Sequence, residues 1–303
     1  MKPRPYTQAP CVCTIGVFDG VHLGHQALLE ALVEDAIRRN CKPVVVTFDR
    51  DPDELFCPQR VHKLLTNAER LDQLKRIIPA VLDLSFTKEL ASQQWQEFLD
   101  GLLLCLPALE AIFVGVNFHC GAQAGGGIPE ITSWGEKHNI SVVAVPLYVH
   151  EGLAVSASRI RALLAAGDVK GAAELLTRPF ALSGCVVAGA GRGHSLGFAT
   201  ANVKVDGSLA MMGPYVYAAY VQLDGKYYKA AVAIGDPPTY SPESQEFNPF
   251  IFEAHLIDYE GSLYGQQLKL EFIDKLRPMQ RFESPGELIA TVMDNIAWVR
   301  ENL

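Results

Sequence analysis

The chain lacks runs of basic residues, long apolar stretches and paired cysteines. Its 303 residues include 26 Lys and Arg against 34 Asp and Glu, a formal net charge of −8 at pH 7, and 49% are hydrophobic. This composition is typical of a folded globular protein, and the length suits about two domains. Because the chain is acidic and has no basic patch, it has no general attraction to a phosphate backbone, and we expect no nucleic-acid partner.

No segment is apolar for long enough to cross a membrane. The most apolar stretch, residues 102–116, is interrupted by Pro107 and Glu110, well short of the ~20 residues of a spanning helix. The first ten residues contain three prolines and no apolar core, unlike a secretory signal. Seven cysteines without a C-x-x-C pair predict reduced thiols. We expect no membrane partner and a cytoplasmic protein, and the oligomeric state stays open.

Residues 1–180 alternate β-branched runs with helical patterns. Strands are predicted at 12–17, 43–48, 111–116 and 141–145, and helices at 22–39, 64–76, 92–104, 158–164 and 169–176. This alternation predicts βαβ units around a parallel sheet, and therefore a Rossmann-like α/β domain.

Residues 181–303 change to a hydrophobic period of two. Strands separated by Gly, Pro or Asp turns are predicted at 182–187, 215–223, 227–234, 250–257 and 267–272. No helical pattern interrupts them, so we expect a mostly antiparallel β-barrel. A C-terminal helix is predicted from Ser284 as N-cap, with Pro285 at its first position.

The segment TIGVFDGVHLGH, residues 14–25, runs from a strand through a loop into a helix. Backbone N–H groups and the helix dipole attract phosphate there, and Gly24 lets a ligand approach the backbone. His22 and His25 would donate hydrogen bonds to phosphate oxygens as charge develops. The alternative is a histidine pair used for packing or helix capping, which the strand-loop-helix setting disfavours. The segment is neither a Walker A loop nor G-x-G-x-x-G.

The segment VSASRIR, residues 155–161, offers a second phosphate site. The hydroxyls of Ser156 and Ser158 and the guanidinium of Arg161 suit a leaving pyrophosphate. The alternative is an N-cap followed by a solvated helix face. The H-x-G-H form of the first segment resembles the nucleotidyltransferase superfamily, and the K-M-S-K-S loop that class I aminoacyl-tRNA synthetases add to it is absent.

The glycine-rich segment GAGRGHSLGFATANV, residues 189–203, lies between two predicted strands. Its backbone amides would surround a phosphate, and Thr200 and Asn202 would supply oxygen ligands for Mg²⁺. The alternative is a flexible loop. Glu253 stands in an apolar strand, where we expect a buried carboxylate acting either as a structural ion-pair partner or as a general base on a sugar-like hydroxyl.

Four motifs of the first half, TIGVFDGVHLGH, VTFDRDP, FVGVNFHCG and VSASRIR, occur in that order. They resemble the FMN adenylyltransferase module of prokaryotic bifunctional riboflavin kinase/FAD synthetases. The resemblance implies that His22 and His25 stabilise adenylyl transfer. It implies nucleotide contacts for Gly16, Phe18, Asp19, Gly24, Asn117, Ser156, Ser158 and Arg161. Asp51 replaces a histidine of the family pattern, Ala157 replaces a serine, and the 120–126 loop is uncharged.

The second half resembles riboflavin kinase through GRGHSLGFATAN, AIGDPPTY, EAHLIDYEG and LRPMQRF. The resemblance implies that Glu253 accepts the proton of the ribityl 5′-hydroxyl, and that Thr200 and Asn202 hold Mg²⁺. It implies nucleotide contacts for Gly191, Arg192, Gly193, His194 and Gly197, and flavin contacts for Arg277 and Phe282. Ala199, His194, Ala233 and Pro237 depart from the family pattern.

The combined motifs predict a bifunctional enzyme that converts riboflavin to FMN in residues 181–303 and FMN to FAD in residues 1–180, with MgATP for both steps. Two alternatives stay open. One is a riboflavin kinase with a degenerate first domain, suggested by Asp51, Ala157 and the uncharged loop. The other is a non-catalytic flavin or nucleotide sensor.

Overall fold

The computed structural model describes residues 5–56, 62–188, 200–235, 240–241, 246–247 and 250–303. The chain forms two compact units. The first consists of Met1–Val61 and Leu65–Ala157, and the second of His62–Leu64 and Ser158–Leu303.

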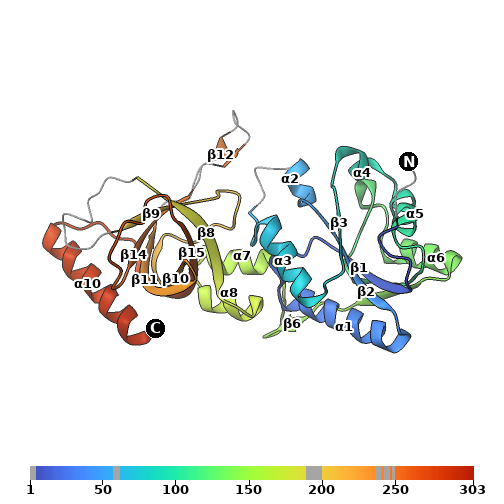
Figure 1. Cartoon of the computed structure of the whole chain (residues 1–303), viewed down its shortest axis with the longest axis horizontal. Helices are drawn as coiled ribbons and strands as arrows, with labels where there is room; N and C mark the ends of the chain where they lie inside the picture. The colour runs from blue at the N-terminus through green and yellow to red at the C-terminus, as the bar shows by residue number, and fades with distance from the viewer. Residues whose placement is uncertain (1–4, 57–61, 189–199, 236–239, 242–245, 248–249) are drawn as a thin grey trace. The chain divides into compact units, whose positions relative to one another are not determined.

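The first unit is built on a five-stranded parallel sheet with the strand order β3-β2-β1-β4-β5 (Figure 1). The strands are β1 (Cys11–Ile15), β2 (Lys42–Phe48), β3 (Val81–Leu84), β4 (Leu109–Gly115) and β5 (Ser141–Val145). Four of them were predicted from their apolar runs, which are typical of strands covered on both faces. The sequence prediction missed β3, which is short and buries fully only Val81.

Helices cover both faces of this sheet. On one face, α1 (Leu23–Arg39) and α3 (Asn67–Ile77) bury Leu29 and Leu74 in one apolar cluster. On the other face, α5 (Trp95–Cys105) and α6 (Ile128–His138) bury Leu99 and Trp134 in a second cluster. The shorter elements of this unit are a 3-10 turn η1 (Asp19–Val21), a second 3-10 turn η3 (Ala122–Ala124), α2 (Pro52–Phe56), α4 (Lys88–Ser92) and a hairpin of β6 (Val149–His150) and β7 (Leu153–Ala154).

The strand order changes direction at the pair β1 and β4. The chain leaves β1 toward β2 on one side, whereas β4 lies on the other side of β1 and leads to β5. In open α/β sheets, ligands bind at the carboxyl ends of the two strands where the order reverses. The loops that follow Ile15 and Gly115 therefore meet at the binding edge expected for this fold.

The second unit contains a closed barrel with the order β10-β11-β14-β9-β8-β15. Its strands are β8 (Phe180–Val187), β9 (Ala201–Val205), β10 (Tyr215–Leu223), β11 (Lys226–Ile234), β14 (Phe250–Leu256) and β15 (Gln267–Pro278), all paired antiparallel. The predicted barrel is confirmed. One prediction was incomplete, because β9 begins within the glycine-rich segment 189–203, where no strand was predicted. A further pair, β12 (Tyr240–Ser241) and β13 (Glu246–Phe247), forms a separate two-stranded sheet.

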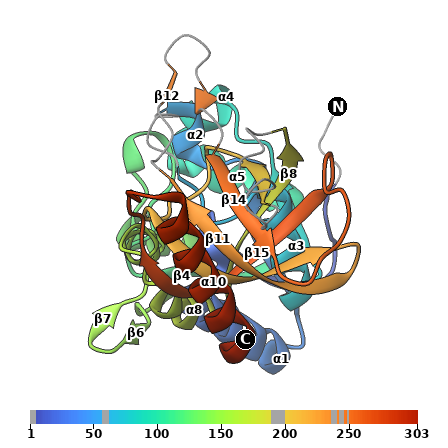
Figure 2. The same ribbon diagram turned by 90° about the vertical axis from the view of Figure 1, so that its left-hand side faces the viewer.

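Among the described residues, three helices belong to the second unit: α7 (Ala157–Ala165), most of which lies in it, α8 (Val169–Leu176) and α10 (Pro285–Asn302). The oxygen of Ser284 accepts the backbone N–H of Glu287 at 3.2 Å, which confirms the predicted N-cap of α10. Helix α10 lies across the barrel and packs Ile296 and Val299 against small residues of β10 and β11 (Figure 2).

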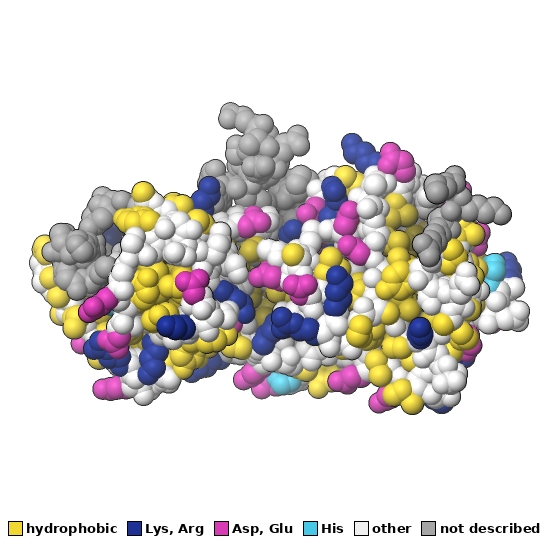
Figure 3. Space-filling model, in the orientation of Figure 1, with side chains coloured by type: hydrophobic (Ala, Val, Ile, Leu, Met, Phe, Trp, Pro, Cys, Tyr) yellow, Lys and Arg dark blue, Asp and Glu magenta, His cyan; other side chains and the backbone are white. Residues whose placement is uncertain are grey.

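Acidic and basic side chains are interspersed on the molecular face that Figure 3 shows. Within the part of the chain that the structure describes, no helix is both long and apolar enough to cross a membrane.

Candidate active sites

The loop after β1 has an unusual backbone. Phe18, Gly20 and Val21 adopt positive φ angles of 59°, 78° and 43°. Glycine tolerates this region, but a β-branched residue such as Val21 is strained there. Such strain is retained where the surroundings hold it in place, typically at functional sites. The loop also buries the Phe18 ring and the Asp19 side chain, which are 2% and 9% exposed.

His22 and His25 form a stacked pair at the start of α1. The helix begins at Leu23, and His22 is its N-cap, with Nδ1 accepting the backbone N–H of His25 at 3.3 Å. The two rings are 3.7 Å apart between centroids, with 15° between their planes. The capping role that we weighed as an alternative is therefore real for His22, and it leaves Nε2 as the N–H donor of the neutral ring.

The His25 imidazole lies in a desolvated position. Its Nδ1 is buried and has no hydrogen-bond partner among the described residues. Burial, and then the nearby His22, hold the pKa of His25 well below its usual range. The ring is therefore neutral near pH 7 and is available as a hydrogen-bonding group.

Gly24 allows two segments to approach each other closely at this helix end. A Cβ at this position would lie 3.2 Å from the His22 ring and 3.5 Å from the carbonyl oxygen of Val155. Val155 precedes Ser156, so the second predicted phosphate segment begins beside the H-x-G-H turn. Within the second unit, the Arg161 guanidinium donates to the Ser158 hydroxyl at 3.3 Å.

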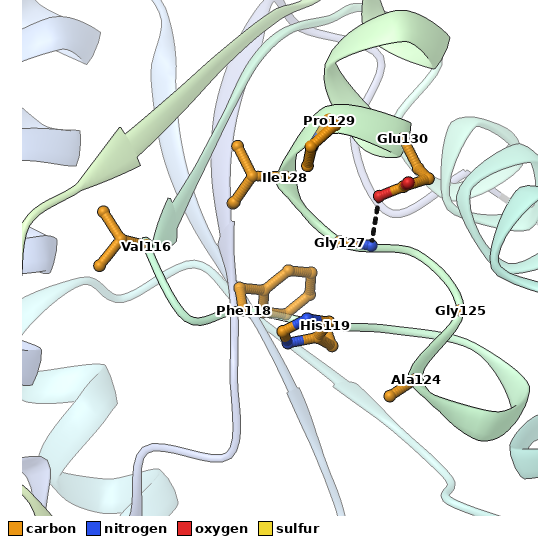
Figure 4. A pocket seen from close by; sticks show the side chains of 9 residues that line it. All are labelled: Val116, Phe118, His119, Ala124, Gly125, Gly127, Ile128, Pro129 and Glu130. Atoms are coloured by element: carbon orange, nitrogen blue, oxygen red, sulfur yellow. Dashed lines mark hydrogen bonds between the residues drawn. The ribbon is translucent and has the colours of Figure 1, made fainter.

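The loop after β4 supplies the other side of the binding edge. Asn117 is exposed, and its Oδ1 lies 3.1 Å from where a Cβ on Gly115 would stand. His119 Nδ1 lies 3.0 Å from the Asn117 carbonyl oxygen. A hollow of about 370 Å³ lies between this loop and the start of α6 (Figure 4). Its lining residues are Val116, Phe118, His119, Ala124, Gly125, Gly127, Ile128, Pro129 and Glu130.

The glycines of this second loop have a packing role. A Cβ on Gly121 or Gly126 would lie 2.4 Å or 2.5 Å from atoms of Trp95, which is closer than real Cβ atoms come. Gly127 is the N-cap of α6, and its N–H donates to the Glu130 carboxylate at 3.1 Å. The hollow is thus bordered by an imidazole and a carboxylate.

Asp51, where the resemblance leads us to expect a histidine, stabilises the start of α2. Its carboxylate accepts the backbone N–H of Asp53 at 2.9 Å. Burial is the main cause that raises the pKa of Asp51. Sequence reasoning missed a residue nearby, the buried Arg70 of α3, because one arginine in a helical pattern gives no signal that distinguishes it from a solvated one.

In the barrel, Glu253 and Asn202 are directly opposed on β14 and β9. Opposed residues have Cβ atoms about 4.5–5.5 Å apart, so the proposed base and the proposed metal ligand are neighbours. Glu253 is exposed, which corrects our expectation of a buried carboxylate: strand alternation turns Phe252 and Ala254 inward and Glu253 outward. Among the described residues it forms no ion pair, so the structural ion-pair alternative is not supported.

The two predicted flavin residues contact each other. The guanidinium carbon of Arg277, at the end of β15, lies 5.6 Å from the centroid of the Phe282 ring, within cation–π range. Burial lowers the pKa of Arg277, and its Nε is buried with no partner among the described residues. The pair therefore places the apolar ring of Phe282 beside the Arg277 Nε–H donor, which has no partner among the described residues.

The predicted phosphate loop of the barrel lies outside the described residues. This applies to Gly191, Arg192, Gly193, His194 and Gly197, and to the departures Ala199 and Pro237. The described part of the site begins at Thr200. No three His, Cys, Asp or Glu side chains of the described residues cluster as a metal site. The hydroxyl and amide oxygens of Thr200 and Asn202 are nevertheless donors that suit a hard divalent cation.

The first unit is a Rossmann-like domain with an H-x-G-H turn where its strand order reverses. The second is a barrel in which a carboxylate and an amide group are neighbours. Together these features define a two-domain enzyme that transfers phosphate groups. The family model for FAD synthetase matches residues 4–159, and the model for riboflavin kinase matches residues 176–303. The chain belongs to the family of bifunctional riboflavin kinase/FMN adenylyltransferases, a class of ATP-using enzymes that requires a divalent metal ion.

Known proteins resemble the chain along most of its length. The bifunctional riboflavin kinase/FMN adenylyltransferase of Pseudomonas fluorescens is 34% identical over 291 residues, which cover 96% of this chain and 92% of that protein. The enzyme of the same description from Escherichia coli K12 is 32% identical over 300 residues, covering 97% and 94%. A crystal structure from Streptococcus pneumoniae, described as a macrolide-efflux protein, has a TM-score of 0.84 at 26% identity and covers 98% of this chain and 95% of its own.

Proposed function

We propose that the protein converts riboflavin to FMN and FMN to FAD, with ATP as the second substrate of both reactions. The kinase reaction belongs to residues 181–303, and the adenylylation, which releases pyrophosphate, belongs to residues 1–180. The observation that carries this proposal is the match of both family models to one chain, whose bifunctional relatives cover 96 and 97% of its length.

In the adenylylation, a phosphate oxygen of FMN attacks the α-phosphorus of ATP, and the bond to pyrophosphate breaks. Charge develops on the α-phosphate oxygens, where fixed N–H donors stabilise the transition state. His22, the N-cap of α1, and the neutral His25 supply such donors beside the first-turn N–H groups of α1. We assign nucleotide contacts to Gly16, Phe18, Asp19, Gly24, Asn117, Ser156, Ser158 and Arg161.

In the kinase reaction, Glu253 accepts the proton of the ribityl 5′-hydroxyl. The hydroxyl oxygen attacks the γ-phosphorus, and ADP leaves. An outward-facing carboxylate can be reached by a substrate, so the observed exposure of Glu253 suits a base better than the buried position we expected. Arg277 and Phe282 would cover the flavin, and Gly191, Arg192, Gly193, His194 and Gly197 would contact the nucleotide.

The divalent metal ion of the kinase step is proposed to be Mg²⁺. Thr200 and Asn202 would hold it with oxygen atoms, and Asn202 stands opposite Glu253 in the strand pairing. When bound, Mg²⁺ neutralises charge on the ATP phosphates. Glu253 would then accept the proton, and the protein backbone would orient the phosphates.

We propose that the protein is located in the cytoplasm, and its cysteines are consistent with this location. The six cysteines among the described residues, at positions 11, 13, 41, 105, 120 and 185, are free. Burial raises the pKa of Cys11 to about 11, which makes that thiol a poor nucleophile. Reduced thiols and an ATP requirement both suit the cytoplasm.

The test is to incubate the purified protein with riboflavin, ATP and Mg²⁺, and to separate the flavins by chromatography. A parallel reaction starts from FMN. We expect FMN and FAD in the first reaction and FAD in the second. FMN without FAD would leave only the kinase, as in the degenerate-domain alternative. Binding of both ligands without any product would support the sensor alternative.

A further inference from the structure

A fully buried arginine lies at the carboxyl edge of the first unit's sheet. Arg70 is 2% exposed. It belongs to α3, whose start is fixed by a capping box in which the Thr66 side chain accepts the Glu69 N–H and the Glu69 carboxylate accepts the Thr66 N–H. The helix thus presents the guanidinium from a fixed position.

The Arg70 guanidinium joins the ends of two neighbouring strands. Nη1 donates to the carbonyl oxygen of Val17 at 2.6 Å and to the hydroxyl of Thr47 at 2.5 Å. Nη2 donates to the carbonyl oxygen of Phe48. Val17 lies in the loop after β1, and Thr47 and Phe48 end β2. One planar side chain therefore holds the loop against the next strand. A lysine would have to reach all three acceptors from a single nitrogen, whereas the guanidinium reaches Phe48 from a second nitrogen.

The clamped loop is the strained one that leads to the histidines. Val17 is followed by Phe18, Gly20 and Val21 with positive φ, and then by His22. Strained backbone of this kind persists only where contacts over-determine it. The bond from Arg70 to Val17 is such a contact, and it lies at the upstream end of the strained segment.

Acidic side chains compensate the buried charge. Burial lowers the pKa of Arg70, while Asp83, Asp19 and Asp51 favour its charged form. Arginine stays protonated in proteins, so a full positive charge is kept at this edge of the sheet. Asp19 is itself part of the strained loop, which adds an electrostatic link to the hydrogen bond at Val17.

We propose that Arg70 is a positioning residue for adenylyl transfer, which holds the Gly16–His22 loop so that the imidazoles of His22 and His25 face the reacting phosphate. It acts through the loop and touches no substrate. The inference rests on the adenylyltransferase function proposed for the first half.

The test compares kcat and KM for FAD formation in the full-length wild type, Arg70→Lys and Arg76→Lys. Arg76 lies in the last turn of the same helix and is exposed, so it is the matched control. For Arg70→Lys we expect a kcat at least ten-fold lower, KM values for ATP and FMN within about three-fold, and a riboflavin kinase rate within two-fold of wild type. Arg76→Lys should match the wild type in all of these.

A double variant separates positioning from simple destabilisation. If Arg70 acts through the histidines, Arg70→Lys should lower kcat by less than three-fold when His25→Ala is already present. An equal loss in both backgrounds, or a kcat for Arg70→Lys within two-fold of wild type, would overturn the inference. A wild type that makes FMN but no FAD would instead overturn the adenylyltransferase function itself, and the inference with it.

Thr47→Val keeps the test decisive if Arg70→Lys does not fold. This variant preserves the arginine and removes one of its three acceptors inside a fully buried site. We expect a kcat for FAD formation about three-fold lower with unchanged KM. An unchanged kcat would contradict the positioning role.

Discussion

The imidazole of His25 stacks on that of His22 with their centroids 3.7 Å apart, and the backbone N–H of His25 donates to Nδ1 of His22. The hydrogen bond fixes which nitrogen of His22 is the donor. Two positive charges at this separation would repel each other, and burial further disfavours the charged form of His25. The pair is therefore suited to hydrogen-bond donation from neutral rings.

Replacing His25 with alanine should remove most of the adenylyltransferase activity. Loss of one donor to a developing oxyanion costs roughly 10²- to 10³-fold in kcat. We expect His25→Ala to lower kcat for FAD formation by that factor and to leave riboflavin phosphorylation within two-fold of wild type. The measurement is FAD and FMN production by the same preparation. A parallel loss of both activities would indicate misfolding and speak against a catalytic role.

The low pKa of His25 predicts a pH-dependent stability. Below about pH 6.5, the usual value for histidine, the unfolded chain binds a proton that the folded protein does not. The contribution of His25 is therefore complete above pH 6.5 and is lost as the pH falls below it. Between pH 7.5 and 5.5 this loss is at most about 1.4 kcal/mol, the limit set by titration of the unfolded chain.

Urea unfolding of wild type and His25→Gln at these two pH values measures this effect. Other titrating groups contribute equally to both proteins, so the change in their difference isolates His25. We expect His25→Gln to gain stability relative to wild type on acidification, by at most about 1.4 kcal/mol. A difference that does not change with pH would mean that His25 is not desolvated.

Periodicity was sufficient to predict the two folds because burial on both sides of a parallel sheet, and on one side of a barrel, leaves distinct patterns. It also placed Ser284 and the H-x-G-H turn correctly. The alternation of Phe252, Glu253 and Ala254 already implies the outward orientation of Glu253, which our expectation of a buried carboxylate did not use. The pairing of Glu253 with β9 could not be predicted, because that strand begins within a glycine-rich segment. Nor did periodicity reveal Arg70, whose acceptors on Val17 and Thr47 lie 53 and 23 positions away in sequence.

The Glu253 carboxylate should be essential for the kinase reaction alone. Glu253→Gln preserves size and hydrogen bonding but removes the proton acceptor, and loss of general base catalysis typically costs 10²- to 10⁴-fold. We expect FMN formation from riboflavin to fall by that factor, while FAD formation from supplied FMN is unchanged. Glu260→Gln, an exposed residue in the turn after β14, is the matched control and should retain both activities. Full kinase activity in Glu253→Gln would exclude the proposed base.

Two glycines of the first unit should respond in opposite directions to alanine. Gly126→Ala places a Cβ 2.5 Å from the Trp95 side chain, so the loop or the start of α5 must move. Such overpacking costs typically 1–3 kcal/mol. Gly101, inside α5, has no atom within 4 Å of its would-be Cβ. Because alanine loses less backbone entropy in a helix, Gly101→Ala should stabilise by about 0.5–1 kcal/mol.

Denaturant unfolding of both variants compares these effects within one unit. The hollow beside the Gly126 loop should also change, so Gly126→Ala is expected to lower FAD formation more than riboflavin phosphorylation, whereas Gly101→Ala should alter neither rate. If Gly126→Ala were as stable and as active as wild type, close packing of the loop on Trp95 would not explain the glycine at this position. The uncharged, glycine-rich loop would then need a different explanation, namely direct approach of a ligand to its backbone.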